Sequence, residues 1–483
     1  MPNYPAVAIG RAPAHAPRRA RLFLLLPRCF FSALSTLFIA TLLWLPLQVR
    51  AAVSAAPESA QATSAEPDLL QPESGLTLAD ALTQLLRNNP QLKLADLTLS
   101  DANLALTQAS MAPAKTLSLT LDNLTGSADL QNGRQLEAGL TLSSVLERGD
   151  RQSQRQALAR SVYAQAEVQR RANALAEIAA LSDLFIRALT RQQQTELAAN
   201  ALESARAVVA DVTARVTQGA APAAEQWRAE AALLQAEVDL SQWQSERDVL
   251  RQQLARYLNP NKNPEAAAMT PLRGDLFRLA TLPDYTQTLQ ALRNSPDHQL
   301  LALQAQQQQA QSALTRSQSA TDLQWQLGLT WGNERNSTAL NAGLSVPLFS
   351  GERNRAALQQ ALNNETRAGL EQQLGERERE QVFFAVWSER QQAAAALSRY
   401  QQSLIPLLTR AVRDTRNAYL RGRYGYSEWA SAQQALLQAQ FQAIDSAARA
   451  QLAHTRLEQM SGLALTDDNR HASDQPLTFT QDH

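Results

Sequence analysis

The side chains able to do acid–base, nucleophilic or metal chemistry are scattered in this sequence of 483 residues. No G-x-S-x-G, H-E-x-x-H or phosphate-binding loop is present. The histidines beyond residue 51 include no pair at the i, i+4 spacing of a helical metal site: His298, His454, His471 and His483. We therefore expect no catalytic residues, no cofactor and no resident metal. An enzyme on a helical scaffold is the weakest of the functional alternatives.

A different mixture of side chains surrounds two glycines. Arginine and tyrosine gather around Gly422 in YLRGRYGYSEW, and Gly219 ends RVTQG just before a proline. Tyrosine and arginine are enriched at protein interfaces, whereas an arginine-rich helix end is also commonly just solvated. Glycine accepts the left-handed backbone that ends a helix. We expect exposed helical tips that dock a partner at Gly219, Pro222, Gly422, Arg423, Tyr424 and Tyr426.

Long helices must carry these turns. Aromatic residues make up only 5% of the sequence, and there is no glycine or proline from Arg151 to Gln218. A helix of that length extends about 100 Å. We predict helical hairpins over 150–258 and 352–460, with a kink at Pro406. The small apolar residues at heptad-like spacing favour coiled-coil packing over a globular core.

Four short segments alternate apolar and polar residues with period two, which is typical of strands: 116–124, 136–144, 323–331 and 340–348. Each segment has one leucine-rich or tryptophan-containing face, and its other face carries Ser, Thr, Asn or Gln. The apolar face that we expect to meet lipid comprises Leu117, Leu119, Leu121, Leu140, Leu142, Trp325, Leu327, Leu329, Trp331, Leu344 and Val346. A soluble sandwich edge with one apolar face is the alternative.

The sequence also repeats itself. Four short matches, including LRN at 86–88 and 292–294 and ALLQA at 232–236 and 435–439, occur in the same order at offsets of 206, 204, 202 and 203 residues. We predict two tandem copies over 76–270 and 280–463, each with a strand pair and a helical hairpin.

The first residues look like an export signal. Residues 1–51 contain six arginines, no acidic residue and an apolar run from Phe30 to Gln48, which predicts a cleaved signal peptide; an uncleaved membrane anchor is the alternative. Residues 52–75 and 464–483 are predicted to be a disordered leader and tail. The whole chain has zero net charge, so removing the signal leaves about −6 and takes away the single cysteine, Cys29. Such a chain gives no reason to expect a nucleic-acid partner.

Four transmembrane strands cannot close a barrel, and open strand edges are not stable in lipid. Closure therefore requires an oligomer. Two copies would give an 8-stranded barrel whose interior is nearly filled, and three would give 12 strands around a conduit.

The order of parts, with the turns RVTQG (215–219) and YLRGRYGYSEWASAQ (419–433), resembles the TolC family of outer-membrane efflux proteins over about residues 75–465. The motifs VPLFSGERNR (346–355) and LSSVLERGDR (142–151) are most similar to its heavy-metal cation (CzcC-like) branch, although Gly149-Asp150-Arg151 departs from the Gly-Gly-Lys-Arg of that branch. The resemblance implies a mainly α fold with transmembrane β: a homotrimer with a 12-stranded β-barrel continued by a 12-helix periplasmic α-barrel.

The resemblance also implies partners and a gate. The tips would meet a periplasmic membrane-fusion adaptor that links the channel to an inner-membrane pump of the RND type. Family members carry a tyrosine three residues before the second tip glycine and acidic residues six and nine after it. Tyr419 and Glu428 match the first two of these positions, and Ser431 replaces the third. Tyr419 and Glu428 are therefore expected to form the entrance gate.

The leading hypothesis is thus a passive outer-membrane efflux channel of a Gram-negative bacterium, with heavy-metal cations as one candidate cargo. The alternatives are a duct for drugs or type I secretion, and a periplasmic coiled-coil adaptor or structural protein. An adaptor is expected to have one hairpin beside a small β domain. Two hairpins and four strands favour the channel.

Overall fold

A computed structural model describes residues 75–123, 136–259, 270–333, 336–348 and 350–463. All the described residues belong to one compact unit of the chain. The predicted signal peptide (1–51) and tail (464–483), and the predicted leader apart from Gly75, lie outside the described residues.

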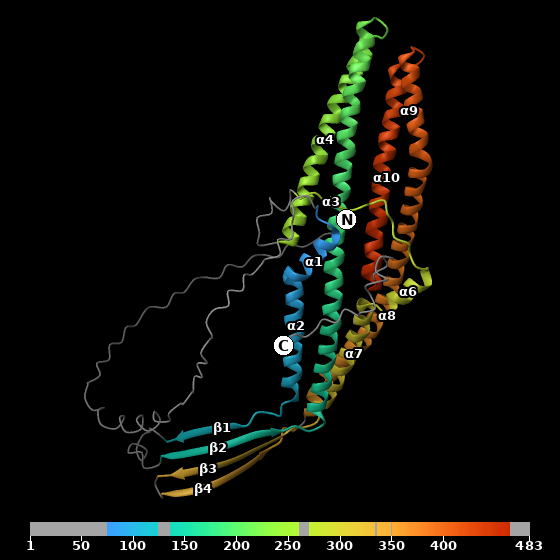
Figure 1. Cartoon of the computed structure of the whole chain (residues 1–483). Helices are drawn as coiled ribbons and strands as arrows, with labels where there is room; N and C mark the ends of the chain where they lie inside the picture. Colours follow the sequence, from blue (N-terminus) through green and yellow to red (C-terminus); the bar gives the residue numbers. More distant parts are fainter. Residues whose placement is uncertain (1–74, 124–135, 260–269, 334–335, 349, 464–483) are drawn as a thin grey trace, which may run out of the picture. The chain divides into compact units, whose positions relative to one another are not determined.

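The described residues are mainly helical, with one small antiparallel sheet, and this part of the predicted fold is confirmed (Figure 1). The helices are α1 (Leu78–Asn88), α2 (Pro90–Ser110), α3 (Arg151–Thr217), α4 (Ala223–Leu258), α6 (Tyr285–Arg293), α7 (Pro296–Ser317), α8 (Ser350–Arg399), α9 (Ile405–Leu420) and α10 (Tyr426–Ser461). The strands are β1 (Thr116–Asp122), β2 (Glu137–Leu146), β3 (Leu323–Gly332) and β4 (Ser337–Ser345).

In the pairs α1–α2 and α6–α7, the second helix begins in the same way. Asn89 caps α2 by accepting from the Gln91 N–H at 2.6 Å, and Pro90 follows as the first helical residue. Ser295 caps α7, and Pro296 follows it. Proline fits the first turn of a helix, where its missing N–H has no intrahelical acceptor. One residue separates α1 from α2, and two residues separate α6 from α7.

The strands form a sheet in the order β1-β2-β3-β4, with every neighbouring pair antiparallel. The register aligns leucines directly across all four strands in the row Leu119, Leu140, Leu329 and Leu340. The adjacent row on the opposite face is Thr120, Gly139, Thr330 and Ala339. Because paired residues share a face, the sheet has one apolar and one polar face.

The last strand differs from its expected bounds of 340–348. It spans Ser337–Ser345, so Val346 lies beyond the paired residues rather than on the sheet's apolar face. Pro347 explains the early end, because proline has no N–H to donate to the ladder.

The helices next to the sheet repeat the order of the strands. Contacts join α2 to α3, α3 to α7, and α7 to α8. The four helices are the ones that precede β1, follow β2, precede β3 and follow β4. Further along, α3 contacts α4 and α10, and α10 contacts α9. Among the described residues, the helices at the ends of each row have a neighbour in that row on one side only. These are α2 and α8 in the first row, and α4 and α9 in the second.

Two arginines on the first turns of α3 brace the junction between helices and sheet. Arg151 donates to the Gln318 carbonyl at 2.9 Å and to the carboxylate of Asp322. Arg155 donates to the Met111 carbonyl at 3.3 Å and pairs with Glu147. These carbonyls follow the last turns of α7 and α2. One helix therefore holds the ends of both its neighbours where the strands begin.

The kink expected at Pro406 takes a specific form. A π-helical turn, Tyr400–Leu404, separates α8 from α9, and the Ile405 N–H donates to the Tyr400 carbonyl five residues back. Proline removes an N–H and its ring crowds the preceding turn, so the backbone widens just upstream.

Two apolar cores matter for function. The larger one gathers Leu181, Phe185, Leu254, Leu276 and Ala447, together with their neighbours, from α3, α4, α10 and the segment before α6. A smaller core at the glycine turns, which we call the tip core, consists of Val208, Val212, Ala229, Tyr419, Tyr426 and Trp429. In the part of the chain that the structure describes, no helix has the length and apolar content needed to cross a membrane.

Candidate functional site

The two glycine turns have the same backbone geometry. Gly219 and Gly422 both have φ of +71°. At the first turn, the Gly219 N–H donates to the Val216 carbonyl and the Ala220 N–H to the Arg215 carbonyl, at 2.9 and 2.8 Å. At the second, the Gly422 and Arg423 N–H groups donate to the Tyr419 and Ala418 carbonyls at 2.8 and 2.9 Å. Both are Schellman caps, in which a left-handed residue lets the last carbonyls of a helix be satisfied.

Tyr419 joins the second hairpin to the first. Its side chain is only 1% exposed, and its hydroxyl donates to the Glu225 carboxylate at 3.1 Å. The other oxygen of Glu225 accepts the Tyr426 N–H at 3.4 Å, at the start of α10. Burial, followed by the hydrogen bond and charge of Glu225, raises the pKa of Tyr419 to about 12. The phenol therefore stays protonated and able to donate at neutral pH.

A second side chain of the first hairpin also reaches Tyr419. Arg215 donates through one nitrogen to the Tyr419 and Leu420 carbonyls at 2.7 and 2.8 Å. Its guanidinium carbon lies 4.7 Å from the centre of the Tyr419 ring. An ion pair between Arg416 and Asp211, at 2.8 Å, adds another link between α9 and α3.

The aromatic residues of the tip core pack together beneath these polar links. Trp429 is 1% exposed, and its ring centre lies 5.4 Å from that of Tyr419 and 6.4 Å from that of Tyr426. Tyr426 is therefore not on the exposed tip with the other expected docking residues. It is 6% exposed, and burial raises its pKa.

The remaining expected tip residues lie in the open. Gly219, Pro222, Gly422, Arg423 and Tyr424 are exposed. Glu428 is also exposed, one turn into α10, and it accepts a hydrogen bond from the Ser427 hydroxyl at 2.9 Å. That bond lowers the pKa of Glu428, so the residue is an anion at neutral pH. Tyr419 and Glu428, the two expected gate residues, thus occupy different environments.

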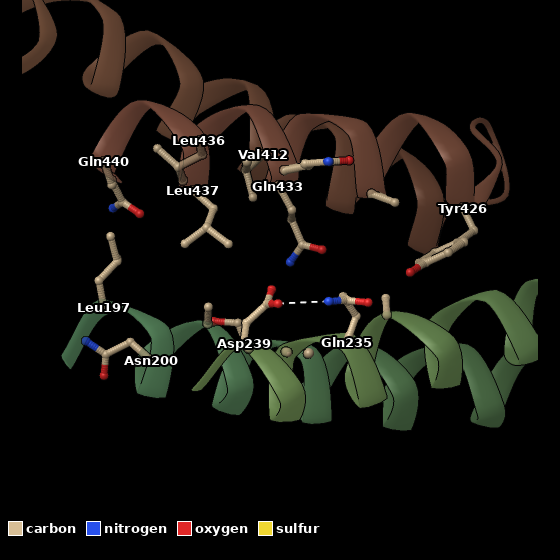
Figure 2. Close-up of a pocket in the computed structure, with 17 residues that line it drawn as sticks. Leu197, Asn200, Gln235, Asp239, Val412, Tyr426, Gln433, Leu436, Leu437 and Gln440 are labelled. Atoms are coloured by element: carbon tan, nitrogen blue, oxygen red, sulfur yellow. Dashed lines mark hydrogen bonds between the residues drawn. The ribbon is translucent and has the colours of Figure 1, made fainter. Parts of the chain in front are cut away.

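A groove of about 580 Å³ runs between the two hairpins beside the tip core (Figure 2). Residues of α3 and α4 line one wall and residues of α9 and α10 the other, with Tyr426 at one end. Asp239 is the one charged lining residue, and it accepts a hydrogen bond from Gln235 at 2.8 Å. Within the described residues, no group of three His, Cys, Asp or Glu side chains is arranged to hold a metal ion.

Sequence reasoning missed Arg215 and Glu225, but a signal for Glu225 was present. Glu225 follows Gly219 by six residues, as Glu428 follows Gly422. The predicted repeat therefore makes these two acids equivalent, although only Glu428 matched the family pattern. No comparable signal identifies Arg215, because its partners are backbone carbonyls of a distant helix.

The expected apolar sheet face is exposed within this chain. Leu117, Leu119, Leu329 and Leu344 are 66%, 70%, 51% and 67% exposed, and Trp331 is 37% exposed. A contiguous apolar patch of this kind is unusual for a surface that faces only water. Among the expected face residues, Trp325 is less accessible and pairs with Leu344.

No family model matches the sequence, and no curated protein matches it. Three solved structures have a similar fold. The outer-membrane channel OprN is 17% identical with a TM-score of 0.69, over 80% of this chain and 90% of that one. CusC, described for its transmembrane channel formation, is 16% identical with a TM-score of 0.68, over 85% and 99%. The outer membrane protein VceC from Vibrio cholerae is 17% identical with a TM-score of 0.68, over 80% and 96%. At these identities the likeness establishes a shared fold.

Proposed function

We propose that this chain is a TolC-family outer-membrane channel subunit that passively conducts substrates out of the cell. The observation that carries the proposal is the sheet, which combines an exposed, largely apolar face with a largely polar opposite face, in a fold shared with outer-membrane channels. An inner-membrane pump would supply the energy, and a periplasmic adaptor would connect the pump to the channel. The export signal expected in residues 1–51 agrees with this location.

The free edges support a homotrimer. β1 and β4 each have a neighbour on one side only, among the described strands. At the same edges, α2 exposes Leu94, Leu97 and Leu104, and α8 exposes Leu370 and Leu374. The two edges differ, so contact between copies is head to tail and closes as a ring. Three copies give a 12-stranded barrel wide enough to conduct, continued by 12 helices.

Neighbouring residues of β3 offer a matched test of the barrel. Leu329 is on the apolar face and Thr330 on the polar one. Leu329→Arg would place a charge in lipid, which costs about 2–4 kcal/mol near the bilayer midplane, whereas Thr330→Arg would face the water-filled lumen. We expect Leu329→Arg to abolish the trimer on semi-native gels. Thr330→Arg is expected to keep the trimer and reduce cation conductance in planar bilayers. Equal effects of the two variants would contradict the barrel.

Cell fractionation tests the location directly. We expect the wild-type protein in the outer-membrane fraction, extracted only by detergent. Release by osmotic shock would contradict the channel and favour a periplasmic coiled-coil adaptor or structural protein.

The tips would serve as entrance and docking surface. Three copies of exposed Glu428 around a threefold axis would attract cations, and Tyr419 would help to hold the hairpins together. The exposed tips at Gly219, Pro222, Gly422, Arg423 and Tyr424 would meet the adaptor, and the groove beside Tyr426 offers it a neighbouring surface. A Tyr419→Phe, Glu428→Ala protein with unchanged conductance and cation preference would contradict this role.

For the cargo we propose heavy-metal cations, on the motif resemblance alone. A deletion strain is expected to become sensitive to zinc, cobalt or cadmium salts and to remain resistant to dyes and detergents. The reverse pattern would assign the channel to organic compounds, and loss of a secreted protein would assign it to type I secretion.

A further inference from the structure

One side chain links the carbonyl ends of both hairpin tips. Arg215 lies in the last turn of α3. It donates to the Tyr419 and Leu420 carbonyls at 2.7 and 2.8 Å, and at 3.3 Å to the Ala220 carbonyl of its own turn. Three acceptors on two separate tips thus share one guanidinium.

The acceptors explain why a cation is suited to this position. The last carbonyls of a helix lack intrahelical donors, and the aligned peptide dipoles give that end a partial negative charge. The helices α3 and α9 both end at the glycine turns, so two negative ends lie close together. A guanidinium between them satisfies the carbonyls and offsets the repulsion.

Arg215 also fixes Tyr419 from a second direction. Its guanidinium lies 4.7 Å from the ring centre of Tyr419, while Glu225 holds the hydroxyl at 3.1 Å. The first hairpin therefore restrains the carbonyl, the ring and the hydroxyl of one residue on the second. At Gly422 it is the φ of +71° that favours glycine, because a Cβ there would make only an ordinary contact, 3.6 Å from the nearer guanidinium nitrogen.

The ion pair that also joins the two hairpins near the tips is weaker. Arg416 and Asp211 form an ion pair whose side chains are 50% and 29% exposed. Ion pairs this accessible contribute little, about 0–1 kcal/mol. Arg215 instead makes charge-assisted bonds to carbonyls, although its buried Nε has no hydrogen-bond partner.

We infer that Arg215 is a positioning residue for the entrance: it clamps the two tips together, and the hairpins separate only when this clamp breaks. The inference rests on the proposed channel function. The planar fork of the guanidinium is required, because the ammonium of lysine is a point donor that does not span carbonyls on two tips.

The test measures the distance between the tips separately from conduction. Spin labels at Gln218→Cys and Arg423→Cys, in a Cys29→Ser background and diluted with unlabelled chains, report the separation of the tips within one chain. Arg215→Met removes the fork and keeps the apolar stem. Arg206→Met is the matched control, because Arg206 is also on α3 but pairs with Glu203 and Glu237 of its own hairpin.

We expect one narrow distance in the wild-type protein and in Arg206→Met, and a broad, longer distribution in Arg215→Met and Arg215→Lys. In bilayers, the open probability of Arg215→Met is expected to rise on the order of tenfold, as loss of one charge-assisted link predicts. In Arg215→Ala, millimolar ethylguanidinium is expected to restore the narrow distance, which general destabilisation of the fold would not allow.

Unchanged distances in Arg215→Met, or equal broadening in Arg206→Met, would overturn the clamp. A wild-type protein that conducts with the same open probability as Arg215→Met would also overturn it. A wild-type protein that never conducts, while the distances still respond to Arg215, would contradict the proposed channel and leave the clamp standing.

Discussion

The turn at Gly219 and the turn at Gly422 have the same φ of +71° and the same capping hydrogen bonds, yet their side chains differ in kind. A Cβ added at Gly219 would touch nothing within 4 Å. The first hairpin contributes the charged groups that hold its neighbour, Arg215 and Glu225, and the second contributes the aromatic residues that are held. Two turns with similar backbones thus contribute complementary side chains to one contact. Substitutions of the same residue type close to the two turns measure how complete this division is.

The largest difference is expected between two tryptophans. Trp429 is 1% exposed in the tip core, whereas Trp227, two residues after Glu225 on the first hairpin, is 67% exposed. Trp429→Ala is expected to destabilise the tips by about 3–5 kcal/mol, because it leaves a cavity. Trp227→Ala is expected to change stability by less than about 0.5 kcal/mol. Hydrogen exchange of the amides in residues 208–229 and 415–430 measures both. A comparable loss of protection in the two variants would show that the tips are equivalent.

Substitutions of the two acids, Glu225 and Glu428, are expected to have smaller effects than those of the tryptophans. The effects of these two substitutions also differ in kind. Glu225→Ala leaves the Tyr419 hydroxyl and the Tyr426 N–H without their acceptor, which we expect to cost about 1–3 kcal/mol in the same exchange measurement. Glu428→Ala removes an exposed carboxylate and is expected to leave tip protection unchanged while lowering cation preference, read from reversal potentials. Unchanged protection in Glu225→Ala would mean that the inter-hairpin bond contributes nothing.

The smallest effect at neutral pH belongs to the hydroxyl of Tyr419. Its pKa in the folded protein, about 12, lies above the value near 10 of a free tyrosine, so the folded state holds this proton more tightly. The resulting stability is fully present below pH 10 and is lost as the pH rises toward 12. Spin-label distances between the tips are expected to increase over that interval in the wild type. Tyr419→Phe has no proton to lose there and is expected to show no such step; an identical step in this variant would contradict the assignment.

Much of the fold follows from short-range patterns. Period-two alternation predicts the faces of the strands, and the row of leucines through Leu119 and Leu329 has the apolar register that burial of one face demands. The tip glycines are predictable because few other residues accept the left-handed backbone with which a helix ends before the chain reverses. β4 ends before the predicted residue 348, because Pro347 has no N–H to donate to the ladder.

Contacts between distant helices were harder to predict. Tyr426 looks like an exposed interface tyrosine in the sequence, but Trp429 and Glu225 draw it into the tip core. The long helices carry small residues on several sides, so their sequences do not indicate which side meets another hairpin. Arg215 was missed for the same reason: bonds to carbonyls leave no complementary side chain to find.

The order of the sheet constrains how the chain can fold. β1 and β2 are neighbours in sequence, but β2 pairs with β3, and Leu146 and Leu323 meet across about 180 residues of chain. Closing so long a loop is slow compared with forming local hairpins. The outer edge of β2 therefore stays unpaired until the second half of the chain has been made. An unpaired strand edge favours aggregation, so the chain is expected to aggregate most readily during that interval.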